Sequence, residues 1–290
     1  MVTLVDATLA HSRLGRDLLA HDVQLACLLE VSAAKPGNIT PAHDFSDTTY
    51  ADMVRSGLAL GPAFARRRAR RRRVGELIAD GVSATARVTD ANTNLGIVLL
   101  MAPLVRAEAT RRADESLRVA TEHVLAELDV DDAATAFAAI VAAHPGGLGE
   151  AADHDVREPA RASLREAMAA AADRDSIASE YATGHRIVFD TGLPLLAEAL
   201  GAGAPTLDAI VSLHVGLLAS QPDTLIERKA GAAAARAVTA AARDVRAGTR
   251  TLEELDASLR GPDHRLNPGT TADLVAATLL VALLTGVDLP

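Results

Sequence analysis

The chain has very few of the aromatic and cysteine residues on which several classes of protein depend. Aromatic residues make up 2% of its 290 residues, tryptophan is missing, and Cys27 is the one cysteine. Proteins that bind single-stranded nucleic acid stack successive bases on several aromatic side chains, so this composition argues against that class. One cysteine excludes an intrachain disulfide framework and a cysteine-rich metal site.

A long apolar run and an excess of basic charge are also missing. No window reaches the roughly 18 apolar residues of a membrane span, and LVAATLLVALL near the C-terminus has the length of a buried helix. No basic leader precedes an apolar segment at the N-terminus, so we expect no signal peptide. The net charge of -9 disfavours a general nucleic-acid binder. We expect a cytoplasmic enzyme or binding protein with no nucleic-acid or membrane partner; the oligomeric state cannot be deduced from the sequence.

Lysine is the third residue in short supply. All but two of the 29 basic residues are arginine, and the two lysines are Lys35 and Lys229. An ammonium group is a compact point charge on a flexible stem, whereas the guanidinium group is a broad planar fork. In a chain so rich in arginine, the two lysines are therefore candidates for phosphate or proton chemistry.

Alanine, by contrast, is abundant. It makes up about a fifth of the chain and is the best helix former, and 49% of all residues are hydrophobic, which is ample for a core. We see no repeat of fixed period and no long linker. The sequence therefore predicts a nearly all-α protein with one domain over residues 1–290.

Apolar periodicity and turn residues predict where the helices lie. The spacing of Thr49 and Asp52 is typical of a capping box and predicts a helix start near Thr48 or Thr49. Thr270 or Thr271 is the expected N-cap of the last helix. The other expected helices cover residues 16–34, 64–88, the segment after the NTN turn at 92–94, 112–143 in two parts divided near 131–132, 159–199, 206–219 and a long alanine-rich segment from about 222, with a break at 144–155.

Four polar segments stand at the ends of these apolar helices. They read KPGNITPAHDFSD, TDANTNLG, QPDTLIERK and LNPGTTAD. Free N–H groups and the positive end of the helix dipole attract anions at helix starts. Aspartates can bind magnesium while phosphates supply its other oxygen ligands. Together the segments suit a phosphate-rich ligand with a divalent metal ion, although each taken alone is also typical of ordinary caps and turns.

The same segments resemble those of the triphosphoribosyl-dephospho-CoA synthase family. The resemblance rests on KPGNITPAHDFSDTTY, GPAF, RVGELI, NTNLGIVLLMAPL, DTLIERKAG and LNPGTTADL, in this order, and extends from about residue 20 to residue 285. It implies an all-α fold and an enzyme for which ATP is the ribosyl donor. The ribose 2′-hydroxyl of 3′-dephospho-CoA would attack the anomeric carbon of ATP, and adenine would leave. The product would be the precursor of a prosthetic group.

The resemblance and the residue types together suggest roles for the polar side chains. A carboxylate could accept the proton of the attacking hydroxyl and stabilise positive charge at the anomeric carbon. The catalytic candidates are Asp44, Asp47, Asp223 and Glu76. Asp44 and Asp47 are also the candidate ligands of an expected Mg²⁺ ion. The candidates for binding ATP, through its phosphates, ribose or base, are Lys35, Asn38, His43, Asn92, Asn94, Lys229 and Asn267.

Two further features have plainer interpretations. Residues 66–73 contain seven arginines, which repel one another on a helix and cannot all face one site, so we expect a solvated surface segment or a mobile loop. Asp273 is expected in the first turn of the last helix, where it would compensate the helix dipole, and a functional role for it stays open beside this one.

Other functions stay open at this point. The doublets His21-Asp22, His43-Asp44 and His154-Asp155 resemble those of all-α metal-dependent hydrolases acting on nucleotides or ADP-ribose. A related ATP-dependent ribosyl transfer to another cofactor and a non-catalytic nucleotide-binding protein are further alternatives. Release of adenine only when 3′-dephospho-CoA is present would separate the transferase from all of them.

Overall fold

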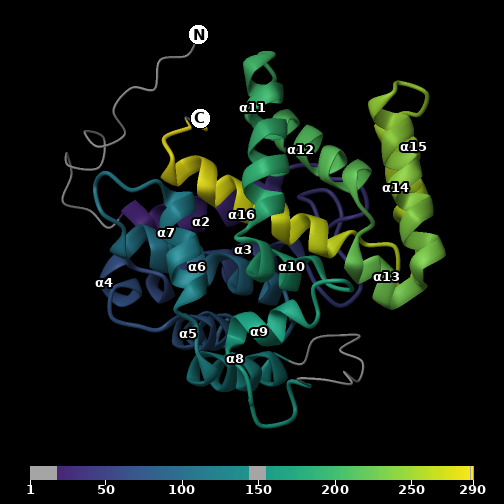
Figure 1. The fold of residues 1–290 in the computed structure, drawn as a ribbon. Helices are drawn as coiled ribbons and strands as arrows, with labels where there is room; N and C mark the ends of the chain where they lie inside the picture. Colours follow the sequence, from purple (N-terminus) through teal and green to yellow (C-terminus); the bar gives the residue numbers. More distant parts are fainter. Residues whose placement is uncertain (1–17, 144–154, 288, 290) are drawn as a thin grey trace.

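Two helices that are apolar on all sides lie in the middle of the molecule. They are α6 (Leu95–Thr110) and α16 (Gly269–Leu284), and most of their side chains are buried. The computed structural model describes residues 18–143, 155–287 and 289, and these contain helices and no β-strand. Figure 1 shows α16 crossing the centre of the fold, and α16 packs against α2 (Leu18–Ser32) and α6. The prediction of an all-α fold is confirmed.

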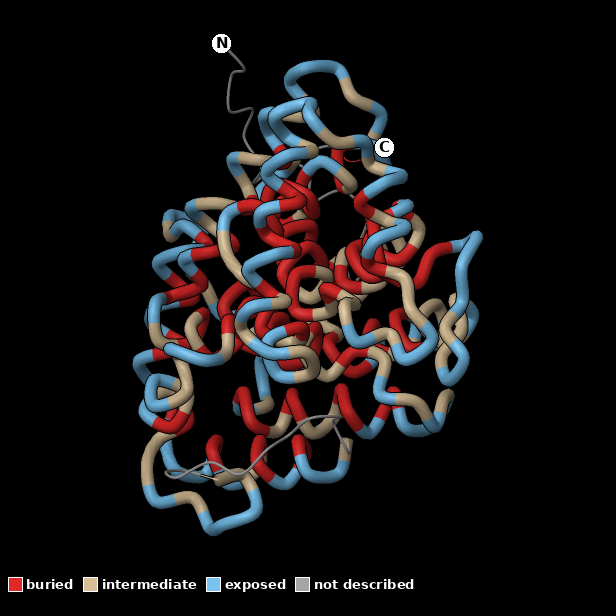
Figure 2. Tube along the Cα trace, turned by 90° about the vertical axis from the view of Figure 1, so that its right-hand side faces the viewer, coloured by how far each residue is buried: buried red, intermediate tan, exposed pale blue. Residues whose placement is uncertain are grey.

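Further helices surround this pair. Helices α3 (Tyr50–Ala63), α4 (Arg66–Ala69), α5 (Val74–Ala86), α7 (Leu117–Ala126), α8 (Val130–Ala142) and α9 (Leu164–Ala169) complete one side. Helices α10 (Ser176–Thr183), α11 (Leu193–Gly201) and α12 (Thr206–Ser220) follow, with the π-helix η1 (Ile187–Gly192) before α11. Buried positions gather along the middle helices, and exposed positions lie on the outward faces (Figure 2).

The apolar side chains form two clusters. The larger one includes α2, α5, α6, α8 and α16. The smaller one joins α12 to α13 (Thr224–Ala230), α14 (Ala232–Arg246) and α15 (Leu252–Leu259). Helix α12 contributes to both clusters, so it connects them. The prediction of one domain over residues 1–290 stays a prediction.

Several helix predictions are confirmed. Thr49 is the N-cap of α3, and its hydroxyl accepts a hydrogen bond from the Asp52 N–H while the Asp52 carboxylate accepts one from the Thr49 N–H. Helices α2, α6 and α12 lie where the apolar periodicity placed them. These features depend on neighbouring residues, and the sequence therefore predicts them well.

The single helix expected over residues 64–88 is wrong. The chain forms α4, turns, and starts again at α5 with Arg73 as its N-cap in an extended conformation. Several of the arginines contact neighbouring helices. Arg66 pairs with Glu108 on α6, and Arg73 pairs with Asp132 on α8. The segment lies at the surface, as expected, with Arg67, Arg68, Arg70, Arg71 and Arg73 exposed, and its ion pairs hold it against the fold.

Two other boundaries also differ from the predictions. The long alanine-rich helix is interrupted by Gly231, whose φ of 89° favours glycine. The last helix begins at Gly269 with Pro268 as N-cap, so neither Thr270 nor Thr271 caps it. The several helices expected over 159–199 are present, and α8 starts at Val130, close to the predicted division. Most of the predicted break at 144–155 lies outside the described residues.

In the described part of the chain, no single helix is both long and apolar enough to cross a membrane. One bent pair, Thr206–Ser220 with Thr224–Ala230, meets the length and composition criteria when the two helices are taken together.

Candidate active site

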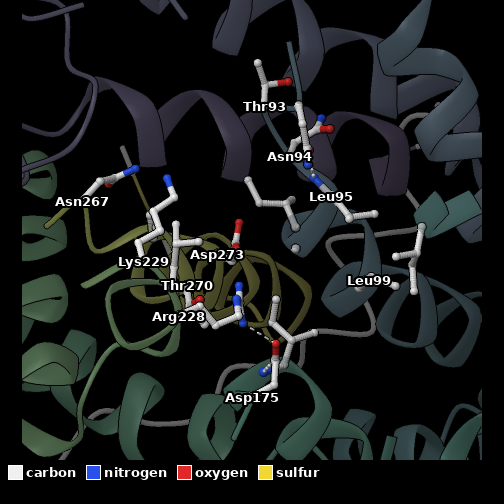
Figure 3. Close-up of a pocket in the computed structure, with 18 of the residues that line it drawn as sticks. Thr93, Asn94, Leu95, Leu99, Asp175, Arg228, Lys229, Asn267, Thr270 and Asp273 are labelled. Carbon is white, nitrogen blue, oxygen red and sulfur yellow. Dashed lines mark hydrogen bonds and ion pairs between the residues drawn. The ribbon is translucent and has the colours of Figure 1, made fainter. Parts of the chain in front are cut away.

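A cavity of about 1080 Å³ lies where helix ends of both apolar clusters meet. All four polar segments predicted from the sequence contribute to its wall. One of them reaches it from the loop before α3. The other three reach it from the N-terminus of α6, from helix α13 and from the N-terminus of α16 (Figure 3). The fold thus gathers segments that are more than 200 residues apart in the chain.

Six of the predicted site residues line this cavity. They are Asn38, Asp47, Asn92, Asn94, Lys229 and Asn267. The remaining five are not part of the cavity wall. They are Lys35, His43, Asp44, Glu76 and Asp223.

The Lys35 ammonium group points into the protein. The side chain is fully buried, its Nζ lies 3.0 Å from Glu30 Oε1, and it also donates to the Glu30 backbone carbonyl. Glu30 itself borders the cavity. In this position Lys35 neutralises Glu30 behind the wall, and its role as a phosphate contact stays a prediction.

The predicted metal ligands lie on an exposed loop. Asp44 Oδ1 accepts a hydrogen bond of 2.6 Å from the Tyr50 N–H at the start of α3. Asp47 is exposed and borders the cavity, whereas His43 is exposed outside it. Among the described residues there is no group of three or more His, Cys, Asp or Glu side chains arranged to bind a metal ion. The metal-binding role of Asp44 and Asp47 stays a prediction.

Asp223 connects two helix starts. Its Oδ1 accepts hydrogen bonds from the N–H groups of Leu225 and Ile226 in α13. Its Oδ2 accepts bonds of 2.7 Å from the N–H and the hydroxyl of Thr271 in α16. The carboxylate is thereby engaged within the fold next to the cavity.

Glu76 lies at the first turn of α5. It accepts a hydrogen bond from the Arg73 N–H and pairs with Arg72 at 2.7 Å, and these contacts lower the pKa of its carboxyl. It therefore stabilises the start of α5, and its catalytic role is not supported by this position.

Carboxylates outnumber cations in the cavity wall. The acidic side chains there are Glu30, Asp47, Asp90, Asp155, Asp175, Glu227, Asp263 and Asp273. The cations are Arg174, Arg228 and Lys229, and Arg228 is already paired with Asp175 at 2.6 Å. Lys229 makes no ion pair with any described residue, and Figure 3 shows its ammonium group beside Asn267. A polyanion in this cavity would need Lys229 and additional positive charge.

Two aromatic rings lie together in the wall. Phe45 stacks on His264 with ring centroids 3.9 Å apart, and the Ser46 N–H donates to His264 Nε2 at 3.3 Å. This contact holds the loop before α3 against the loop before α16. Neither ring is predicted as part of the site, because nothing in the local sequence indicates a contact between two residues that are 219 positions apart.

Other wall residues were also missed or interpreted differently. Glu30 was not predicted from the sequence, although a lone glutamate on an apolar helix five residues before a lysine is a usable signal. Asp273, for which both a dipole role and a functional role were open, is the fifth residue of α16 and borders the cavity.

The comparisons with known proteins agree with the resemblance seen in the sequence. The model of the family described as ATP:dephospho-CoA triphosphoribosyl transferase matches residues 16–288. The structure is similar to that of an Archaeoglobus fulgidus protein assigned as a triphosphoribosyl-dephospho-CoA synthase, with a TM-score of 0.64 and 26% identity, over 80% of this chain and 99% of that one. No curated protein gives a significant match. The chain belongs to the ATP:dephospho-CoA triphosphoribosyl transferase family.

Proposed function

We propose that the protein transfers the 5-triphosphoribosyl group of ATP to the ribose 2′-hydroxyl of 3′-dephospho-CoA and releases adenine. The observation that carries this proposal is the meeting of all four family-like segments at one cavity of about 1080 Å³. Pockets for a single small ligand usually measure about 300–1,000 Å³. The cavity is therefore larger than the usual pocket for one small ligand, which suits bulky nucleotide substrates.

The wall offers suitable groups for each part of ATP. Lys229 is the candidate phosphate contact, and the N-termini of α6 and α16 add N–H groups and positive dipole ends. Asn38, Asn92, Asn94 and Asn267 provide amides for the ribose and the base. The triphosphate stays on the sugar throughout the reaction, so contacts to it hold the substrate in place while the base leaves.

The cavity wall supplies carboxylate oxygens, which are the kind of ligand that Mg²⁺ prefers. Asp47 presents a carboxylate at the cavity, and the excess of acidic side chains would repel a triphosphate without a cation. Because no group of three ligand side chains is gathered among the described residues, most ligands would be phosphate and water oxygens. When bound, the ion would neutralise charge on the triphosphate.

The hydrolase alternative has little support from the geometry. His21 and His43 are exposed, and neither borders the cavity. His154 lies outside the described residues. A transfer to a different cofactor acceptor would use the same donor site, so the acceptor has to be decided by experiment.

The test is release of adenine. The purified chain is incubated with ATP, Mg²⁺ and 3′-dephospho-CoA, and a parallel sample omits the acceptor; both are analysed by liquid chromatography and mass spectrometry. We expect adenine and a triphosphoribosylated acceptor only in the complete sample. Adenine without the acceptor would instead establish a hydrolase, and ATP binding without adenine in either sample would contradict this transfer.

A variant of Lys229 links the activity to this cavity. We expect Lys229→Ala to weaken ATP binding by about 10- to 100-fold, since a hydrogen bond to a charged group contributes about 1.5–3 kcal/mol. Arg236→Ala, at an exposed position of α14, is a control of similar charge change. Equal ATP affinity in the Lys229 variant and the wild type, measured by calorimetry, would remove Lys229 from the site.

A further inference from the structure

The carboxyl group of Asp273 differs from the other acidic groups of the cavity wall. It points into the cavity from α16 (Figure 3) and makes no hydrogen bond or ion pair with any described residue. Glu30 is paired with Lys35, Asp175 with Arg228, and Asp155 with Arg157. The other four, Asp47, Asp90, Glu227 and Asp263, are exposed. Asp273 is thus the half-buried carboxyl group that is left available for a ligand.

The position of this carboxyl group depends on Gly96 in the first turn of α6. A Cβ atom on Gly96 would lie 2.0 Å from Asp273 Oδ2 and 2.4 Å from its Cγ, far inside van der Waals contact. Only glycine therefore allows the carboxyl group to rest against the start of α6. Helices α6 and α16 hold it there from two sides.

The charges around Asp273 favour its protonated form. Glu30 and Cys27 face it from α2, Asp175 from the start of α10, and Asp223 and Arg228 from α13. Arg228 is the one cation in this set, and Asp175 already binds it. Burial, together with Glu30, Asp223 and Asp175, raises the pKa of Asp273 well above its usual range.

We propose that Asp273 is the proton donor to the departing adenine. This inference rests on the proposed function, because it assigns a role within that reaction. The C1′–N9 bond breaks and its electron pair goes to the purine, while the carboxyl proton of Asp273 moves to a purine ring nitrogen. The acceptor hydroxyl oxygen forms the new bond to C1′, and its proton returns through water to the Asp273 carboxylate. The sum is ATP plus acceptor giving product plus neutral adenine, with no net change in protons.

A proton donor matches this carboxyl group better than a base does. A base at the acceptor hydroxyl would have to be ionised, and the acidic surroundings oppose ionisation. A leaving purine needs a proton at its ring nitrogens as negative charge develops there, and general acid catalysis of this kind contributes about 10²- to 10⁴-fold.

The first experiment compares Asp273→Asn with the wild type in the complete adenine-release assay. We expect kcat to fall by about 10²- to 10⁴-fold, with the KM for ATP within a few-fold of the wild-type value. In the wild type, kcat should fall as pH rises through the raised pKa, and this decrease should be absent in the variant. Asp244→Asn, at an exposed position of α14, is the matched control and should keep full activity.

A substrate that needs no protonation separates a proton donor from a merely structural aspartate. In 7-methyl-ATP the base already carries a positive charge and leaves without a proton, so Asp273→Asn should act on it at nearly the wild-type rate. A sample without enzyme corrects for its spontaneous decomposition. An equal loss on ATP and on 7-methyl-ATP would overturn the proposal.

Gly96→Ala provides a second test that keeps Asp273. The added methyl group should displace the carboxyl group and lower kcat by at least 10-fold, while alanine preserves the helix. Gly201→Ala is the control, because a Cβ there meets no atom within 4 Å. Circular dichroism shows whether Asp273→Asn is folded. If it is not, full activity of Gly96→Ala would overturn the proposal. An active wild type with an equally active Asp273→Asn would reject this inference and leave the transferase standing, whereas an inactive wild type would reject both.

Discussion

The two lysines of the chain have opposite surroundings. Lys229 borders the cavity without an ion pair to the described residues, and Lys35 is fully buried against Glu30. A buried pair of charges is strongly destabilised when one partner is removed, because the other charge is then left without compensation. We therefore expect replacement of Lys35 to lower the stability of the protein and replacement of Lys229 to weaken ligand binding.

We expect Lys35→Ala to lower the free energy of unfolding by about 3–5 kcal/mol, since it leaves the Glu30 carboxylate buried and unpaired. Urea unfolding followed by circular dichroism measures this change. The double variant Lys35→Met with Glu30→Leu should recover most of the loss, because apolar residues replace the whole pair. If Lys35→Ala were as stable as the wild type, the buried Glu30 carboxylate would not need Lys35 to compensate its charge.

At the scale of the helices, Asp223 joins the starts of α13 and α16. Its carboxylate accepts four hydrogen bonds, two from each helix. The larger and smaller apolar clusters meet at this point, since α16 belongs to one and α13 to the other. One side chain thus determines how two elements of the cavity wall are positioned.

Asp223→Asn should destabilise the protein by about 2–3 kcal/mol, because an amide has one acceptor oxygen and charge-assisted bonds contribute about 1.5–3 kcal/mol. Thr271→Val, which removes one hydroxyl bond to the same carboxylate, should cost about 1 kcal/mol. Thermal unfolding measures both variants. An Asp223→Asn protein with wild-type stability but no activity would instead favour the catalytic role predicted from the sequence.

The π-helix η1 also depends on a single carboxyl group. The chain leaves α10 through Gly184 and His185, both with positive φ, and Glu180 accepts hydrogen bonds from the N–H groups of Ile187 and Val188. Glu180 is fully buried, and burial raises its pKa to about 7. The folded protein therefore binds a proton here more tightly than the unfolded chain does.

This difference gives the stability a pH dependence of known sign. The contribution of Glu180 to the free energy of unfolding is fully present below the unfolded-state pKa of 4.5. This contribution is lost as the pH rises to about 7. Over this pH range the free energy of unfolding of the wild type should fall by about 3 kcal/mol relative to that of Glu180→Gln, because one pKa unit corresponds to ~1.4 kcal/mol. Urea unfolding of both proteins from pH 4.5 to 7.5 measures it. A stability difference that does not change with pH would contradict the raised pKa.

At the scale of the whole molecule, the cavity lies between the two apolar clusters. Helices α2, α6 and α16 of the larger cluster and α13 of the smaller one all border it. Figure 1 shows α14 and α15 on the side of the molecule away from α5 and α8. A ligand in the cavity contacts both parts and should stabilise them together.

Binding of ATP with Mg²⁺ should therefore raise the melting temperature of the whole protein. At a ligand concentration of about 100 times Kd, the stabilisation is about 2.7 kcal/mol. In EDTA the effect of ATP should largely disappear, because the wall holds more carboxylates than cations. Thermal shift measurements with ATP and Mg²⁺, ATP and EDTA, and Mg²⁺ alone test this. An equal shift in EDTA would show that side-chain cations suffice.

The sequence by itself determined the helical class, the positions of α2, α3, α6 and α12, the capping box at Thr49 and the four polar segments that mark the family. These properties depend on residues close together in the chain, where periodicity, caps and turns act. The break between α4 and α5 could not be predicted from the sequence, because it depends on contacts with distant residues, such as that of Arg66 with Glu108 on α6.

Only the tertiary structure decided which polar side chains reach the cavity. Lys35 and Asp223 occur in the right segments, but the approach of Glu30 and Thr271 engages them within the fold. The sequence places Asp273 near the start of the last helix, where a role in the helix dipole is expected. Its place at the cavity depends on Gly96, 177 positions earlier, which lets the start of α6 lie against it. The charge and exposure of a side chain depend on which distant elements surround it, and that arrangement exists only once the helices have packed.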